Sequence, residues 1–123
     1  MEDSYAIMEY AFNYSQKNYN KPIYALGRSL GGAVTINLAS QNKYAKVFRG
    51  IILENTFTSI GEMVDCLFPV LVPFKFLQRN FWPSIDRIKK ITCPILFIKS
   101  MQDELVPPIH MHRLMEAATC RKK

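Results

Sequence analysis

The sequence predicts an α/β domain with three parallel strands and flanking helices. Three apolar runs, at residues 23–26, 47–53 and 94–98, are separated by longer stretches with helical patterning. Strands that alternate with helices are joined by right-handed crossovers, and such crossovers produce a parallel sheet. A chain of 123 residues with 49% apolar residues forms one domain at most and is long enough to bury a core.

The amino-terminal third is predicted as helix, strand and helix. Residues 3–18 carry apolar side chains at helical spacing, and the polar stretch before Pro22 ends this helix. Residues 23–26 form the first strand. A run of small and apolar residues from 32 to about 41 predicts the second helix, which follows the strand after a short turn.

The rest of the chain repeats strand and helix around one irregular stretch. The strand at 47–53 is nearly continuous in its apolar half, whereas residues 58–82 are rich in Phe, Leu, Val and Pro and predict irregular structure. Residues 83–90 predict a short helix and residues 94–98 a third strand. Residues 108–118 predict a last helix, which opens with a proline suited to a first turn.

The most informative motif is a G-x-S-x-G pattern centred on Ser29, between the first strand and the second helix. In this context the pattern is typical of a nucleophile elbow, a strained turn that holds a serine hydroxyl clear of the sheet. Bulky side chains two residues either side would collide where strand and helix cross, so Gly27 and Gly31 are expected there. Gly32 completes the set of elbow glycines.

The helix that follows the elbow directs its amino-terminal amides at the serine hydroxyl. These dipoles favour negative charge at the reacting centre, and the amide of Leu30 is the predicted donor to an oxyanion. The chemistry that this pattern indicates is hydrolysis of an ester-like bond through an acyl-enzyme on Ser29. It implies no metal and no organic cofactor.

Two carboxylates compete for the role of the catalytic acid. Asp103 lies in a short loop between the third strand and the last helix, and we interpret it as the acid that would orient a histidine base. Glu54 lies at the end of the second strand, and residues 54–56, like Ser29 and Asp103, fall just past the carboxyl end of a strand, where the sites of parallel sheets gather. We interpret Glu54 as a structural carboxylate bonded to the turn amides of residues 55–56.

The general base that would accept the proton of Ser29 has no obvious candidate at the usual position in this sequence. The usual order is serine, acid, histidine, and the only histidines are His110 and His112 in the first turns of the last helix. We expect both to be exposed helix side chains, and either could act as the base only through an unusual geometry. The expected histidine would lie beyond one more strand, past Lys123.

Charge, cysteine spacing and hydropathy limit the partners, metal or disulfide sites and membrane segments that the sequence is compatible with. The formal net charge of +6 comes from scattered Lys and Arg without the interleaved aromatics of a nucleic-acid surface, so we expect no nucleic-acid partner. Cys66, Cys93 and Cys120 have neither metal-ligand spacing nor a disulfide framework and are interpreted as buried or idle thiols in a reducing compartment. The chain opens with no signal peptide, and its apolar run at 66–74 is too short to span a membrane.

Four blocks, in order, carry a family resemblance: residues 27–34, 52–60, 73–75 and 103–108. Together they resemble the bud-emergence branch of the alpha/beta-hydrolases, the branch of proteins like alpha/beta-hydrolase domain-containing protein 13. The resemblance spans nearly all of the chain. It implies an alpha/beta-hydrolase fold, present here in part, and serine hydrolase activity.

The resemblance also implies roles, substrates and a location. It assigns Ser29 as the nucleophile and Asp103 as the triad acid. It implies an acyl ester or thioester substrate, lipid-like or an acyl protein, as for a palmitoyl-protein thioesterase. It implies membrane association, because relatives carry an amino-terminal hydrophobic anchor, although no anchor is present in these residues. The sequence leaves the oligomeric state open.

The departures from the family pattern bear on activity. Residues 1–123 correspond to a partial domain that lacks the amino-terminal strands, the loop with the second oxyanion amide, and the carboxyl-terminal strand with its histidine loop. We therefore expect a fragment with the elbow strand at a sheet edge and with little activity by itself. Residues 57–82 are either a lid over the site or ordinary packing over the sheet. The alternative function is an inactive remnant that binds an acyl ligand or a partner protein.

Overall fold

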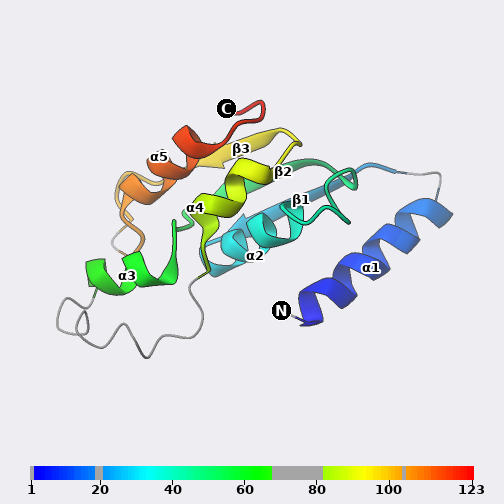
Figure 1. The fold of residues 1–123 in the computed structure, drawn as a ribbon, viewed down its shortest axis with the longest axis horizontal. Helices are drawn as coiled ribbons and strands as arrows, with labels where there is room; N and C mark the ends of the chain where they lie inside the picture. The colour runs from blue at the N-terminus through cyan, green and yellow to red at the C-terminus, as the bar shows by residue number, and fades with distance from the viewer. Residues whose placement is uncertain (1, 19–20, 68–81, 104) are drawn as a thin grey trace.

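The computed structural model describes residues 2–18, 21–67, 82–103 and 105–123 (Figure 1). Its sheet has the parallel order β1–β2–β3, with β1 at Ile23–Arg28, β2 at Phe48–Glu54 and β3 at Ile95–Ile98. This confirms the predicted fold class and all three predicted strands. The strand β1 is longer than predicted because it continues in register with β2 up to the residue before Ser29.

The helices follow the predicted order with one addition. They are α1 at Glu2–Lys17, α2 at Leu30–Ala39, α4 at Ser84–Arg87 with a 3₁₀ turn at Ile88–Lys90, and α5 at Pro108–Ala117. The helix α2 begins two residues earlier than predicted, directly after the elbow serine. The predictions for the first, second and last helices and for the short helix are otherwise confirmed.

The interpretation of residues 58–82 as irregular is wrong in its first part, because α3 occupies Ile60–Leu67. The reason is a local capping signal: the Ser59 hydroxyl oxygen accepts a hydrogen bond from the Glu62 amide at 3.1 Å. Serine followed three residues later by glutamate is the capping-box pattern. Residues 68–81 lie outside the described residues, so the choice between lid and packing for 57–82 stays open.

One face of the sheet carries the core. The side chains of Ile51, Leu53 and Ile95 are buried against the helices, in a cluster with residues of α2, α4 and α5. Strands added in one direction through right-handed crossovers place their helices on the same side of the sheet. Leu26 on β1 and Leu96 on β3 point to the opposite face and are exposed, at 65% and 39%.

The two edges of the sheet differ. The elbow strand β1 forms one edge, as expected. At the other edge the last residues of the chain run parallel to β3. The amide of Ile95 donates to the Arg121 carbonyl at 2.9 Å, and the amide of Lys123 donates back to the Ile95 carbonyl at 3.1 Å. A short fourth line of backbone pairing therefore covers the outer side of β3.

Candidate active site

Ser29 occupies a strained turn between β1 and α2. Its φ of 50° and ψ of −121° lie in a region that residues with a side chain rarely adopt. The turn is held from both sides, because the Ser29 amide donates to the Glu54 carbonyl at 3.0 Å and the Ser29 carbonyl accepts from the Gly32 amide at 3.0 Å. The residue is exposed, so its hydroxyl is presented to solvent at the end of the strand.

The elbow glycines serve different purposes. A Cβ atom at Gly27 would lie 2.5 Å from both the Gly31 carbonyl oxygen and Thr35 Oγ1, which explains why this position has no side chain. A Cβ atom at Gly32 would lie 2.5 Å from Cβ of Thr56. The expectation that Gly31 avoids a collision is wrong, because a Cβ atom there meets nothing within 4 Å. The close contact belongs to Gly32, whose Cα faces the loop after β2.

That loop connects the elbow to Asp103 through Thr56 and Asn55, two residues that sequence reasoning placed at this edge of the sheet without assigning their contacts. Thr56 Oγ1 donates to the Ser29 carbonyl at 2.7 Å. Asn55 has a positive φ of 42°, and its side-chain amide donates to Asp103 Oδ2 at 2.6 Å. Asn55 Oδ1 also accepts from the Ser100 amide at 2.8 Å. The block 52–60 pointed to this loop, but no local pattern distinguishes these contacts from an ordinary turn.

Asp103 lies in the loop after β3 and is held by donors on both carboxylate oxygens. Its Oδ1 accepts from the amides of Leu105 and Val106, each at 2.9 Å, and its Oδ2 accepts from Asn55. The Val106 amide, then the Leu105 amide, the Asn55 side chain and the charge of Arg28 hold the pKa of Asp103 below its usual value. Asp103 is therefore ionised at neutral pH, as an acid that orients a base must be.

The carboxylate of Glu54 has a different neighbour from the one expected. Its Oε1 lies 3.9 Å from Nε of Arg28, across the β1–β2 pair, rather than on the turn amides of residues 55–56. The Arg28 side chain is 70% exposed, so this pair is a surface ion pair of small energetic weight. The contribution of Glu54 to the elbow comes from its backbone carbonyl, which accepts from Ser29.

The two histidines of α5 have separate surroundings. His112 is exposed, and its Nε2 lies 3.3 Å from the Glu116 carboxylate. The expectation that His110 is exposed is wrong, because only 2% of it is accessible. Its Nδ1 lies 2.8 Å from Thr58 Oγ1, and burial lowers the pKa of His110. The reason is tertiary: the loop after β2 brings the buried Thr58 against His110, across 52 positions of sequence.

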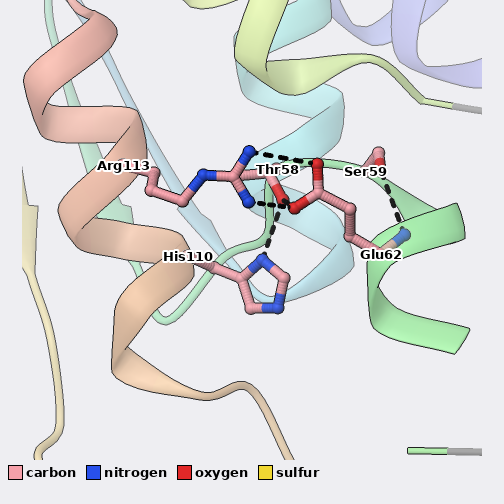
Figure 2. Close-up of polar contacts among 5 residues, drawn as sticks. All are labelled: Thr58, Ser59, Glu62, His110 and Arg113. Atoms are coloured by element: carbon pink, nitrogen blue, oxygen red, sulfur yellow. Dashed lines mark hydrogen bonds and ion pairs between the residues drawn. The ribbon is translucent and has the colours of Figure 1, made fainter. Parts of the chain in front are cut away.

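Thr58, Glu62, His110 and Arg113 form one polar cluster between α3 and α5 (Figure 2). Thr58 Oγ1 donates to Glu62 Oε2 at 2.8 Å, so its single hydroxyl proton is used and it accepts the proton of His110 Nδ1. The Arg113 guanidinium contacts both Glu62 oxygens. Partial burial acts to raise the pKa of Glu62, but the hydrogen bonds from Thr58 and Arg113 outweigh it and lower that pKa.

Leu30 is the first residue of α2, and its amide therefore has no acceptor within its own helix. Its assignment as an oxyanion donor stays a prediction, as do the catalytic roles of Ser29 and Asp103.

Among the described residues, no helix is both long and apolar enough to cross a membrane. Over the same ranges, no three His, Cys, Asp or Glu side chains gather in a way that could hold a metal ion.

Comparison with curated proteins finds clear relatives. Alpha/beta hydrolase domain-containing protein WAV2 of Arabidopsis thaliana is 43% identical over 111 residues, which cover 80% of this chain and 35% of WAV2. Protein bem46 of Schizosaccharomyces pombe is 37% identical over 124 residues, covering 98% of this chain and 40% of bem46. An uncharacterized membrane protein of Saccharomyces cerevisiae is 39% identical, covering 79% of this chain and 34% of that protein.

The chain thus spans between about a third and two fifths of the length of these relatives. No protein-family model matches it.

Solved structures show the same arrangement of strands and helices at low sequence identity. The esterase domain of a Rhodothermus marinus protein matches 94% of this chain with a TM-score of 0.65 and 18% identity, over 54% of its own length. An acylaminoacyl peptidase of Pyrococcus horikoshii matches 99% with a TM-score of 0.70 and 16% identity, over 22% of its own length. These likenesses establish the fold.

Proposed function

Because this chain belongs to the alpha/beta-hydrolases, we propose that it carries the nucleophile and the acid of a serine hydrolase that cleaves an ester or thioester. One observation carries the proposal. The strained turn of Ser29 and the carboxylate of Asp103 are joined through the loop after β2, by Thr56 on one side and Asn55 on the other. Two groups that are remote in sequence are thereby held at one edge of the sheet.

In the proposed reaction the Ser29 hydroxyl oxygen attacks the carbonyl carbon of the substrate while a histidine takes its proton. The Leu30 amide donates to the oxyanion, the alcohol or thiol leaves with that proton, and water then cleaves the acyl-serine. Asp103 orients the histidine. Its three described donors leave room for a fourth at the carboxylate, which can accept about four hydrogen bonds. The histidine is proposed to come from outside these 123 residues.

The surroundings of the site favour an acyl substrate. Leu30, Met101, Leu105 and Ile109 are all exposed, and they flank Ser29 and Asp103 at the carboxyl edge of the sheet. Exposed apolar side chains around a polar centre fit the chain of a lipid-like ester or an acyl-protein thioester. Among proteins of similar fold is a monoacylglycerol lipase of Paleococcus ferrophilus, with a TM-score of 0.60 and 13% identity.

We further propose that the protein works at a membrane surface. One relative is named an uncharacterized membrane protein, and the net charge of +6 would attract a surface of acidic lipids. Binding to vesicles with acidic lipids, but not to neutral ones, is the expected result. Equal binding to both kinds of vesicle, or to neither, would contradict the proposal.

The decisive test of the hydrolase proposal is labelling of Ser29. A fluorophosphonate probe should modify Ser29 in the product of the complete gene, and Ser29→Ala should abolish both the labelling and ester turnover. The loss of rate is expected to be on the order of a thousandfold or more, because the members of a triad act as a unit. Labelling that survives Ser29→Ala would remove Ser29 from the proposal.

The assignment of the acid is tested by two matched amide variants. Asp103→Asn keeps the shape but loses the charge that holds the histidine tautomer, so turnover should fall by up to ~10,000-fold. Glu54→Gln removes only the exposed partner of Arg28 and should change turnover little. If Glu54→Gln is the damaging change, the two roles are exchanged.

A second candidate function is non-catalytic binding of an acyl ligand or a partner protein. The observation in its favour is the exposed apolar face that carries Leu26 and Leu96. Binding of a fluorescent fatty-acyl probe that is unchanged by Ser29→Ala, in a gene product without ester turnover, would support this candidate over the hydrolase.

A further inference from the structure

The carboxyl-terminal residues bring together two cysteines that are far apart in sequence. Lys122 forms a parallel bridge with Ile95, and the amide of Phe97 donates to the Lys123 carbonyl at 2.8 Å. The two segments thus run side by side in a defined register. Cys93 lies two residues before Ile95, and Cys120 lies two residues before Lys122.

Counted back from this bridge, Cys93 and Cys120 hold equivalent positions, each at a bend just before the backbone pairing begins. Paired segments lie ~4.8 Å apart, so the chain leaves the bends at Cys93 and Cys120 toward two lines that are one strand spacing apart. Disulfides form between Cα atoms about 4.4–6.8 Å apart, so the spacing of adjacent strands falls in the permitted range.

Two further observations are consistent with neighbouring thiols. Both side chains pack on the same core cluster, with Cys93 buried and Cys120 partly exposed. Burial raises the pKa of the Cys93 thiol, and the negative charge of Cys120 raises it further, so the two sulfur atoms are within electrostatic reach. Burial likewise raises the pKa of Cys120.

We propose that Cys93 and Cys120 are a redox-active dithiol pair that closes to a disulfide when it meets a small-molecule disulfide such as oxidised glutathione. The Cys120 thiolate, which is the more accessible, attacks one glutathione sulfur and releases one reduced glutathione. The Cys93 thiolate then attacks the Cys120 sulfur and releases the second. Two protein thiols are oxidised, one glutathione disulfide is reduced, and the two thiol protons pass to the departing glutathione thiolates.

The position of the pair gives the disulfide a structural consequence. The covalent ring would run from residue 93 to residue 120 and would contain β3, the loop of Asp103 and the whole of α5. It would also fasten residues 121–123 covalently to β3, with which they already share backbone hydrogen bonds. Oxidation would therefore restrict opening of the part of the fold that carries the acid, because the open states lose chain entropy.

The test uses the product of the complete gene with Cys66→Ser, and the Cys93–Cys120 disulfide is identified from its linked peptides. The chain is equilibrated in glutathione redox buffers, in native buffer and in concentrated urea, and the closed disulfide is counted by mass spectrometry. If the fold preorganises the thiols, the equilibrium constant for closing the disulfide should be at least ~10-fold larger in native buffer than in urea. This corresponds to a difference of roughly 30 mV in reduction potential. Adding Cys120→Ser should leave only the glutathione adduct of Cys93.

The control compares pairings in the chain with all three cysteines. In native buffer the Cys93–Cys120 disulfide should dominate over disulfides that include Cys66, whereas in urea the three pairings should be mixed. Equal closure of the Cys66→Ser chain in native buffer and in urea would overturn the proposal, as would a dominant native disulfide to Cys66.

Discussion

Gly32 shows at the scale of one residue why the elbow needs glycine. Its missing side chain lets α2 approach the loop after β2, where Thr56 donates to the carbonyl of Ser29. Gly31 is also a glycine and lies one residue earlier on the same helix, but a Cβ atom there would meet nothing within 4 Å. The two positions therefore form a natural pair for separating a steric requirement from a general preference for glycine.

Gly32→Ala should destabilise the fold by ~1–3 kcal/mol, because the new methyl group would overlap Thr56. Gly31→Ala should leave stability unchanged or raise it by up to ~1 kcal/mol, since alanine favours a helix over glycine. Urea denaturation of both variants of the complete gene product measures the difference. Equal losses at the two positions would show that the close contact with Thr56 does not govern stability.

Asp103 makes the stability of the site depend on pH. Its pKa is lower in the folded protein than the ~3.9 of a free aspartate, so the folded state gains stability above that value. The gain is lost as the pH falls through the lower folded pKa, because protonation removes the acceptor of the Val106 and Leu105 amides. Stability should therefore decline in acid below about pH 4.

Asp103→Asn should reduce this acid decline, because an amide does not titrate over that range. The check is the urea midpoint of wild type and variant between pH 3 and 6, with Asp86→Asn as a control at an exposed carboxylate on α4. An acid decline that is the same in all three proteins would mean that the contacts of Asp103 do not contribute to it.

At the scale of elements, the cluster of Thr58, Glu62, His110 and Arg113 joins α3 to α5. The buried half of the cluster, between Thr58 and His110, should matter more than the exposed half. Thr58 is fully buried, whereas the side chains of Glu62 and Arg113 are 34% and 45% exposed. A buried donor that loses its partner keeps the full desolvation penalty, while a surface ion pair is replaced by water.

Thr58→Val should cost ~1–3 kcal/mol, because it keeps the shape but leaves His110 Nδ1 without this acceptor. Arg113→Met should cost only ~0.2–1 kcal/mol. Amide hydrogen exchange over α3 should accelerate in Thr58→Val and stay unchanged in Glu116→Gln, which alters an exposed pair on α5. Faster loss of protection in Arg113→Met than in Thr58→Val would reverse this ranking.

At the scale of the whole molecule, the described helices cover one face of the sheet. Parallel sheets are normally packed on both faces, yet Tyr24 and Leu26 on β1 and Leu96 and Ile98 on β3 are exposed on the second face. The edge of β1 adds backbone groups for which the described part of the chain offers no partner strand. These surfaces favour association with another chain or segment.

The purified 123-residue chain should therefore aggregate or unfold readily and should hydrolyse a short-chain ester near the background rate. Loss of one oxyanion donor alone typically costs ~100- to 1,000-fold. Leu26→Thr combined with Leu96→Thr should reduce aggregation, measured by light scattering, because both side chains are exposed. A cooperative thermal transition together with turnover that depends on Ser29 would contradict this prediction and would make His110 and His112 candidates for the base.

The sequence by itself determined the order of strands and helices, the elbow, and the edge of the sheet that holds Ser29 and Asp103. These features depend on local patterns: apolar periodicity, a glycine-flanked serine after a strand, and the crossover rule that brings the carboxyl ends of parallel strands to one edge. The helix α3 was also within reach of sequence reasoning, because Ser59 and Glu62 have capping-box spacing.

Only the tertiary structure decided which glycine is sterically required, where His110 lies, and that the segment after Cys93 pairs with the segment after Cys120. Gly32 meets Thr56, His110 meets Thr58, and Ile95 pairs with Lys122, each across a long separation in sequence. Such contacts depend on how complete elements pack and on the register between strands. The pattern of residues within one segment does not determine how far that segment lies from another. The sequence therefore does not show whether a given glycine, histidine or cysteine is exposed or in contact with a distant residue.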